Sequence, residues 1–411
     1  MALSYVWVFL IIIGFVIALF KLIVFQDVEL FKQMAEGLFD TAENSVMKIG
    51  LPLVGSMTFF LGLLNIAERA GAINVIARLI GPFFGTLFPE VPKNHPATGH
   101  MVMNFSANLL GLDNAATPFG LKAMQSLQEL NPDKETASNA QIMFLVLHTS
   151  GLTLIPISIM AYRSSAGAIN PTDIFVPCIL GTLITTLAAI FVVGIKQRLK
   201  LNTKFVLSLA AIVFGLLLFC TMVGYMTKDV KQTFSLIFGN VLLMLIVVGI
   251  LAGGMYKKIN LFDAFVDGAK AGFETVVKII PYLVGMLCAI SIFRTSGAFD
   301  FIMDGFSYVF NACGINTDFV KAMPTALMKP FSGSGARGLM IDTMKVEGPQ
   351  SFAGYLSCIF QGSADTTLYI VALYFGSVGI KKVRYSIWAG MFADLIGIIA
   401  AIIIARITYP Y

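Results

Sequence analysis

Long apolar stretches alternate with short polar segments along almost the whole chain. A helix needs roughly 20 mainly apolar residues to cross the hydrocarbon core of a bilayer. Many of the apolar stretches approach or exceed that length with few charged side chains, so we predict a series of membrane-spanning helices. The predicted spans are 3–25, 46–66, 139–162, 173–195, 205–226, 235–256, 279–294, 350–376 and 385–408.

The composition leads to the same class. Of the 411 residues, 57% are hydrophobic and 12% are charged. The charged fraction is about half that of soluble domains, and so much apolar surface cannot be buried in a globular core of this length. We therefore predict an all-α integral membrane protein. The first span is expected to be a retained helix, because no basic region precedes it and no small-residue cleavage site follows.

The same sequence blocks occur twice, in the same order. Order and spacing, rather than identity, separate a duplication from chance similarity between apolar segments. We predict two homologous helical repeats, one over 1–196 and one over 233–411. The matching blocks are 52–55 with 281–285, 68–76 with 294–302, and 147–162 with 360–375.

The connector between the repeats, 197–232, contains the span 205–226, which has no counterpart in either repeat. An unpaired crossing reverses the orientation of the segments after it, so the repeats are predicted to be inverted. By the positive-inside rule, two loops rich in basic residues face the cytoplasm. The segment 163–172, the counterpart of the second loop, holds one cation and would lie on the outer side, as inverted repeats require. The basic residues are Lys196, Arg198, Lys200 and Lys204 in one loop and Lys381, Lys382 and Arg384 in the other.

Each repeat contains a polar break, near 98–125 in the first and 319–345 in the second. These segments are too rich in Gly, Asn, Ser and Pro for plain lipid-facing helices, and irregular backbone at membrane depth survives only where protein or water satisfies it. We predict a discontinuous helical hairpin in each repeat, with tips at 111–117 and 332–337. In secondary transporters with inverted repeats, the substrate lies at the midplane between them.

The hairpin tips and the helix starts that follow them carry the candidate substrate-binding residues. Backbone amides at the start of a helix after Ser332, together with Arg337, favour an anionic group. The alternative is that the tip residues are ordinary helix N-caps, that Arg337 extends to a membrane interface, and that the hydroxyls bond nearby backbone. The candidates are Asn108, Asp113, Asn114, Thr117, Ser150, Thr153, Ser332, Gly333, Ser334, Arg337, Gln361, Ser363, Asp365 and Thr366.

Asp365 stands out because a carboxylate inside an apolar segment is costly and is a functional candidate by default. It would bind Na⁺ or carry a proton, or else form a structural pair with Arg337 or Lys122. Lys122 aligns with Asp342, and this oppositely charged couple is either a salt bridge between the repeats or part of the site.

Other features exclude several functions. His95 and His100 have a poor spacing for one helical face, so we predict neither a metal site nor a cofactor there. No enzyme motif and no basic, aromatic-rich stripe for nucleic acid is present. The amphipathic stretches 27–45 and 260–278 are predicted to lie along the membrane surface as scaffold arms.

Several motifs resemble a known family. The first half, through GLDNAATPFGLKAM at 111–124, LFPEVPKNHPATG at 87–99 and TSGLTLIP at 149–156, resembles spore maturation protein A. The second half, through IPYLVGMLCAISIFRTSGAFDF at 280–301, QGSADTTLYIVALYFGSVGIKK at 361–382 and ADLIGIIAAIII at 393–404, resembles spore maturation protein B. The resemblance implies a fusion of the two, in the nucleoside-recognition or gate-domain group, located in the bacterial inner membrane.

Two functions follow as hypotheses. The first is a secondary transporter or permease for a small polar metabolite, such as a nucleoside or a small peptide, moved by alternating access between the inverted repeats. The group name alone suggests nucleosides. The second is a non-transporting membrane factor for envelope or spore maturation, whose polar tips hold helices together. The lipid bilayer is the predicted partner, and the sequence leaves a homo-oligomer open.

Overall fold

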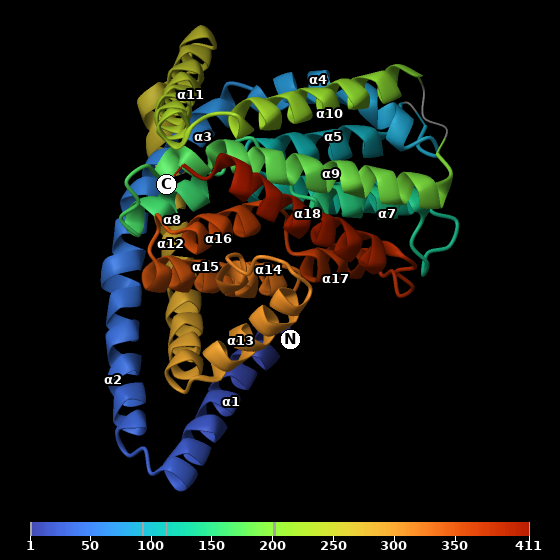
Figure 1. Ribbon diagram of the computed structural model, residues 1–411. Helices are drawn as coiled ribbons and strands as arrows, with labels where there is room; N and C mark the ends of the chain where they lie inside the picture. The colour runs from blue at the N-terminus through green and yellow to red at the C-terminus, as the bar shows by residue number, and fades with distance from the viewer. Residues whose placement is uncertain (1, 93, 112, 200–202, 411) are drawn as a thin grey trace.

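The computed structural model describes residues 2–92, 94–111, 113–199 and 203–410. These residues form helices joined by short turns, without a β-strand (Figure 1). The helices are α1 (Ala2–Phe25), α2 (Glu29–Asn44), α3 (Leu51–Arg69), α4 (Ala72–Leu87), α5 (Pro96–Leu109), α6 (Asp113–Leu130), α7 (Asn139–Thr149), α8 (Ile157–Ser165), α9 (Phe175–Gln197), α10 (Thr203–Gly224), α11 (Lys228–Tyr256), α12 (Leu261–Thr295), α13 (Ala298–Ala312), α14 (Met323–Met328), α15 (Gly333–Glu347), α16 (Phe352–Gly362), α17 (Thr367–Ser377) and α18 (Ser386–Thr408).

Within the described part of the chain, eight helical stretches are long and apolar enough to cross a membrane. This confirms a multi-pass, all-α membrane protein. The stretch 139–162, predicted as one span, is instead two helices, α7 and α8, separated by non-helical backbone at 150–156. Hydropathy alone cannot reveal such a break, whereas Gly151, with a φ of 63°, and Pro156 mark where it lies.

Both amphipathic stretches, predicted to lie along the membrane surface, continue into long helices. The first, α2, runs through a π-helical turn at Ser45–Gly50 into α3, so Glu29–Arg69 is one helical stretch of 41 residues. Pro52 explains the turn, because proline cannot donate the regular helical hydrogen bond and crowds the preceding turn. The second stretch is the beginning of α12, which is 35 residues long.

The long helices α3 and α12 pack against each other through small residues on α12. A Cβ atom on Gly268 would lie 2.5 Å from the carbonyl oxygen of Leu61, and one on Gly272 would lie 2.8 Å from that of Met57. The Asn65 side-chain amide adds a hydrogen bond of 2.6 Å to the Ala264 carbonyl. Close approach through glycines four residues apart is typical of helix pairs in membranes.

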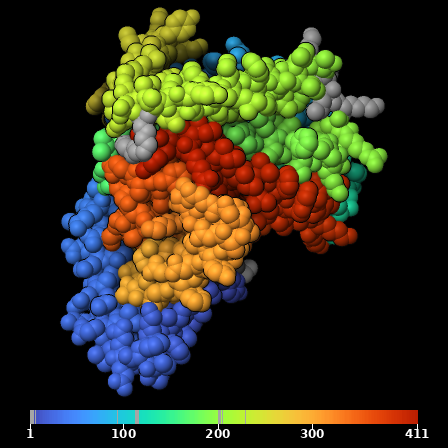
Figure 2. Space-filling model, viewed as in Figure 1, coloured from blue at the N-terminus to red at the C-terminus, as the bar shows by residue number. Residues whose placement is uncertain are grey.

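The structure repeats its elements in the order predicted from the sequence. The series α3, α4, α5–α6, α7–α8 and α9 corresponds to α12, α13, α14–α15, α16–α17 and α18. Gly71 and Gly297, which align in the sequence, both have a left-handed φ, 82° and 83°, at the equivalent turns before α4 and α13. Helix α10 has no counterpart and lies on the outside of the molecule (Figure 2).

The equivalent segments α7–α8 and α16–α17 run in opposite directions. α7 packs against α17 and α8 against α16. At one end of this pair, the amides of Lys381 and Lys382, after α17, both donate to the carbonyl of Glu135, before α7, at 2.9 Å. At the other end, Arg163 on α8 donates to the carbonyl of Pro349, before α16, at 3.0 Å. The repeats are therefore inverted relative to each other.

The two basic loops lie at the same end of the molecule. The side-chain amide of Gln197 donates to the Tyr385 hydroxyl at 2.8 Å, and the Lys196 ammonium lies 6.0 Å from the centre of the Tyr385 ring. A shared side is what the positive-inside rule requires of both loops. The division at 1–196, 197–232 and 233–411 remains a prediction, with α10 inside the connector.

Candidate functional site

Each repeat contributes a helical hairpin, α5–α6 in the first and α14–α15 in the second. The first arm of the second hairpin is short, a 3₁₀ turn at Val320–Ala322 followed by α14. At its tip, Ser332 caps α15 by accepting a hydrogen bond of 3.0 Å from the Gly335 amide. The predicted hairpins are thus present, and the N-cap alternative also holds for Ser332.

In each repeat, a backbone group just before the hairpin tip accepts a hydrogen bond from an amide in or directly after the helix break. In the first repeat, the Leu154 amide donates to the carbonyl of Leu109 at 2.8 Å. In the second, the Leu368 amide donates to the carbonyl of Pro330 at 3.0 Å. These bonds satisfy backbone groups that the breaks leave free, which is the condition for irregular backbone inside a membrane protein.

The two helix breaks, 150–156 and 363–366, cross each other at the centre of the molecule. The Asp365 amide donates to the carbonyl of Thr149 at 2.8 Å. Gly151 lies against the same backbone, where a Cβ atom would be 3.0 Å from the Asp365 nitrogen. Its positive φ and this close approach both require glycine.

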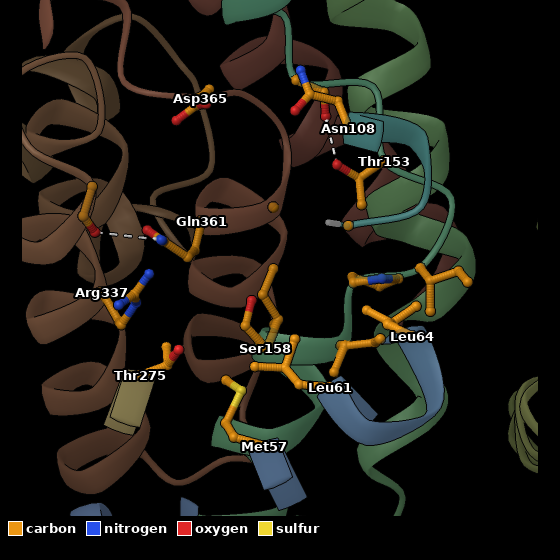
Figure 3. A pocket seen from close by; sticks show the side chains of 18 of the residues that line it. Met57, Leu61, Leu64, Asn108, Thr153, Ser158, Thr275, Arg337, Gln361 and Asp365 are labelled. Atoms are coloured by element: carbon orange, nitrogen blue, oxygen red, sulfur yellow. Dashed lines mark hydrogen bonds between the residues drawn. The ribbon is translucent and has the colours of Figure 1, made fainter. Parts of the chain in front are cut away.

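A cavity of about 420 Å³ lies beside this crossing point (Figure 3). Its polar wall comes from both repeats, with the first hairpin and break on one side and the second hairpin and break on the other. Its apolar wall comes from α3 and α12. The polar side chains include Asn108, Thr153, Arg337, Gln361 and Asp365, and the apolar ones include Met57, Leu61, Leu64 and Ile279.

Charged groups of both signs line the cavity. Lys329 and Arg337 come from the second hairpin, Asp365 from the second break and Glu68 from α3. The Arg337 guanidinium lies 5.5 Å from the centre of the Tyr162 ring, so it is directed inward rather than to an interface. The Asp365 side chain is 45% exposed and faces the cavity (Figure 3). The site can therefore hold a solute with charged or strongly polar ends.

His148 is the principal polar residue at the site that is not among the predicted ones. It is buried at the end of α7, and its Nε2 lies 4.0 Å from the Asp365 carboxylate and 3.3 Å from the Tyr374 hydroxyl. Its Nδ1 lies 2.9 Å from the side-chain oxygen of Asn104 and 2.9 Å from the side-chain nitrogen of Asn108. This network connects the first hairpin to Asp365. Its sequence signal is a histidine in an apolar helix directly before a break.

The structure brings together six of the candidate binding residues around the cavity. These are Asn108, Thr153, Gly333, Arg337, Gln361 and Asp365.

The other described candidates lie elsewhere. The hydroxyls of Ser150 and Ser363 donate to the carbonyls of Leu147 and Phe360 one turn earlier, at 2.6 and 3.1 Å. Neither serine lines the cavity, because backbone acceptors within reach satisfy both hydroxyls. The remaining candidates outside the lining are Ser332 and Ser334 at the second tip, Thr366 in the second break, and Thr117, which is exposed on α6. The backbone of α6 begins at Asp113, and the side chains of Asp113 and Asn114 lie outside the described residues.

The predicted couple of Lys122 and Asp342 is not formed. Asp342 accepts hydrogen bonds of 2.6 and 3.2 Å from Arg294 within its own repeat, and Lys122 is exposed on α6. Among the described residues, the Asp365 carboxylate lies 4.0 Å from the His148 ring and forms no ion pair with Arg337 or Lys122. Alignment of the repeats compares equivalent positions and does not show which helices are in contact. It could therefore not reveal that Arg294, on α12, pairs with Asp342, on α15.

Comparison with known proteins fits this architecture. A family model described as "Gate: Nucleoside recognition" matches residues 51–169 and 276–381, which contain both hairpins and both helix breaks. The chain belongs to the nucleoside-recognition Gate family. It is 49% identical to spore maturation protein B of Bacillus subtilis over 165 residues, or 40% of this chain and 91% of that protein. It is 40% identical to spore maturation protein A of the same organism over 187 residues, or 46% of this chain and 91% of that protein.

These two similarities are consistent with a fusion, because the two proteins are separate chains whose matches each cover less than half of this one. The matched region includes the residues at which the two breaks cross. No enzyme class is indicated by the family or by these relatives.

Proposed function

We propose that the protein is a secondary transporter that moves a small polar metabolite through the cavity between its inverted repeats. The observation that carries the proposal is that both helix breaks, both hairpin tips and two long helices meet at one cavity. Broken helices and inverted repeats surround the substrate in many secondary transporters. The family description, nucleoside recognition, supports a nucleoside as one candidate.

The lining of the cavity supports a solute with one anionic or strongly polar end and one apolar face. Lys329 and Arg337 supply positive charge, and Gly333 places the positive end of α15 at the cavity. The side-chain amides of Asn108 and Gln361 supply directional hydrogen bonds. The apolar wall from α3 and α12 suits a base or an aliphatic side chain, and about 420 Å³ is within the usual range for small-molecule sites.

Alternating access would require the hairpins and broken helices to move against α3 and α12. The packing supports α3 and α12 as one rigid wall, because backbone atoms approach closely at Gly268 and Gly272. The crossing of the two breaks, in contrast, shows the backbone hydrogen bond from Asp365 to Thr149. Coupling to Na⁺ or H⁺ is part of this proposal.

A thermal-shift screen of purified protein tests the proposal. Nucleosides, dipeptides, dicarboxylates and Na⁺ are added separately, and a compound that binds only the folded state raises the unfolding temperature. We expect a saturable shift with at least one compound. Replacing a charged group that bonds to the solute removes about 1.5–3 kcal/mol, so Arg337→Gln and Asp365→Asn should weaken binding by about 10- to 150-fold.

The matched control is Arg406→Gln, which breaks an exposed ion pair with Asp318, since neither residue lines the cavity. It should leave the ligand-induced shift unchanged. If no compound stabilises folded protein, or if the control variant loses the shift as fully as Arg337→Gln does, transport through this cavity is contradicted. That outcome would favour a membrane factor that assembles with other envelope components.

A further inference from the structure

A second buried carboxylate lies next to the crossing of the helix breaks, outside the cavity lining. Asp394, on α18, is 5% exposed. One of its oxygens accepts a hydrogen bond of 2.7 Å from the hydroxyl of Thr367, the first residue of α17 after the second break. The other oxygen, Oδ1, is buried without a hydrogen-bond partner among the described residues.

Helix packing does not require a carboxylate at this position. Gly390 and Asp394 on α18 have the same spacing as Gly181 and Thr185 on α9, the equivalent helix of the first repeat. The two glycines pack against the breaks, since a Cβ atom on Gly181 would lie 3.3 Å from Ser363, and one on Gly390 would lie 2.6 Å from Thr367.

In the first repeat, the Thr185 hydroxyl donates a hydrogen bond of 2.9 Å to the Gly181 carbonyl of its own helix. A threonine therefore fills this place in the inverted framework without leaving a polar atom unpaired. In the second repeat, Asp394 leaves Oδ1 unpaired. The carboxylate thus adds a chemical property that the packing does not need.

The charged groups that act on Asp394 are Lys329 and Asp365, both of which also line the cavity. One is positive and the other is negative, so their effects oppose each other. His148, on α7, faces Asp365 at 4.0 Å. An ionised carboxylate with a bare buried oxygen is costly in an apolar interior, and a proton on that oxygen removes the charge.

We propose that Asp394 is a proton-binding site that couples protonation to the state of the second helix break. In the arrangement described here, Asp394 carries a proton on Oδ1 and accepts the hydrogen bond from Thr367 on Oδ2. When α17 moves with the break, the bond from Thr367 is lost, water reaches the carboxyl group, and the O–H bond releases the proton to that water as the carboxylate forms. The coupling to solute movement rests on the proposed transport function, whereas the proton site does not.

Lys329 opposes the uptake of a proton and of a metal cation at Asp394 alike, and Asp365 favours both, so the neighbouring charges do not choose between them. The ligand set favours a proton, because Na⁺ would need several oxygen ligands. Among the described residues, the side-chain oxygen that hydrogen-bonds to the Asp394 carboxyl group is that of Thr367, which is fewer oxygen groups than a Na⁺ site needs.

Infrared spectroscopy of the purified full-length protein at neutral pH tests the proton site without any substrate. We expect the carbonyl stretch of one protonated carboxyl group, and we expect Asp394→Asn to remove it while keeping an acceptor for Thr367. If Asp394→Asn does not fold, Asp394→Thr, which copies the first repeat, serves as the second variant. Asp318→Asn, at an exposed ion pair, should leave the band unchanged.

The same protonated-carboxyl band, present or absent, in wild type and Asp394→Asn would overturn the proposal, since that band would then not come from Asp394. Loss of the wild-type band on adding Na⁺ at constant pH would also overturn it, in favour of a cation site. Where the screen has found a ligand, saturating ligand should shift the pH at which the band disappears, and no shift would refute the coupling. Where no ligand exists, the transport proposal fails and the infrared result alone decides the proton site.

Discussion

The ion pair of Arg163 and Asp173 offers a sharp test of how the inverted repeats are held together. Both side chains are fully buried, and their charged groups are 2.8 Å apart. Arg163 lies at the end of α8 and also donates to the carbonyl of Pro349 in the other repeat. We therefore predict that Asp173→Ala strongly destabilises the folded protein, because it leaves the guanidinium buried without its carboxylate.

The expected magnitude depends on this burial. Breaking a fully buried pair by removing one partner costs about 3–5 kcal/mol, whereas an exposed pair contributes about 0–1 kcal/mol. Arg406 and Asp318 provide the exposed comparison, with 41% and 36% of their side chains accessible. A loss of about 3 kcal/mol changes the unfolding equilibrium constant by about 150-fold.

The assay is reversible unfolding in mixed micelles with increasing sodium dodecyl sulfate, followed by circular dichroism. Asp173→Ala and Arg163→Met should each lower the free energy of unfolding by at least three times as much as Asp318→Ala. The double variant Arg163→Met/Asp173→Leu should recover most of this loss, because a buried pair is often replaceable by apolar residues of similar volume.

The reasoning is refuted if Asp173→Ala is no more destabilising than Asp318→Ala. It is also refuted if the double variant is less stable than both single variants. In that case the loss of stability in the single variants would not come mainly from an unpaired buried charge. The hydrogen bond from Arg163 to the second repeat would then contribute more to stability than the charge pairing does.

The remaining predictions concern glycines at close approaches. Gly268→Val should lower the unfolding temperature markedly, since even a Cβ atom there would lie 2.5 Å from a backbone oxygen of α3. Gly55→Val, with open space around it, should have a small effect, and equal effects of the two variants would contradict tight packing of α3 and α12. Gly151→Ala should weaken the ligand-induced thermal shift more than Gly376→Ala, because alanine at position 151 strains a φ of 63° and crowds the Asp365 amide. An unchanged shift in Gly151→Ala would show that ligand binding does not depend on the crossing of the breaks.

The repeat architecture could be predicted because it leaves a signal in sequence order. The equivalent glycines Gly71 and Gly297 and the polar hairpins are visible in both halves of the sequence. Helices α4 and α13 were not predicted from the sequence, since they are short and amphipathic, and neither is among the helices long enough to cross a membrane. The break between α7 and α8 was also missed, because a sum over hydropathy does not register a local change in backbone direction.

The site was predicted less completely than the fold. Asp365 could be singled out because a carboxylate inside an apolar segment is costly, and Arg337 because it adds a positive charge at the polar hairpin tip; both line the cavity, and their role in binding remains a prediction. The same rule applies to Asp394, which is not among the predicted site residues. Ser150 and Ser363 lie outside the cavity lining, and the sequence could not show this, because a hydroxyl that bonds its own helix looks the same in a sequence as one that faces a ligand.

The apolar wall had no sequence signal at all. Met57 and Leu61 lie on α3, far along the chain from the hairpins they face across the cavity. Leucine and methionine are common on every face of a membrane helix. Their place in the site depends on long-range packing, which a single sequence does not display.

The central claim is that the cavity opens alternately to the two sides of the membrane. The direct measurement is labelling of Ser158→Cys, a half-buried position in the cavity lining (Figure 3), with a membrane-impermeant thiol reagent in oriented vesicles, after subtraction of the labelling of the native cysteines. The account predicts labelling of this position from both sides of the membrane. Labelling from one side only, in protein that is folded and unblocked, would contradict alternating access through this cavity.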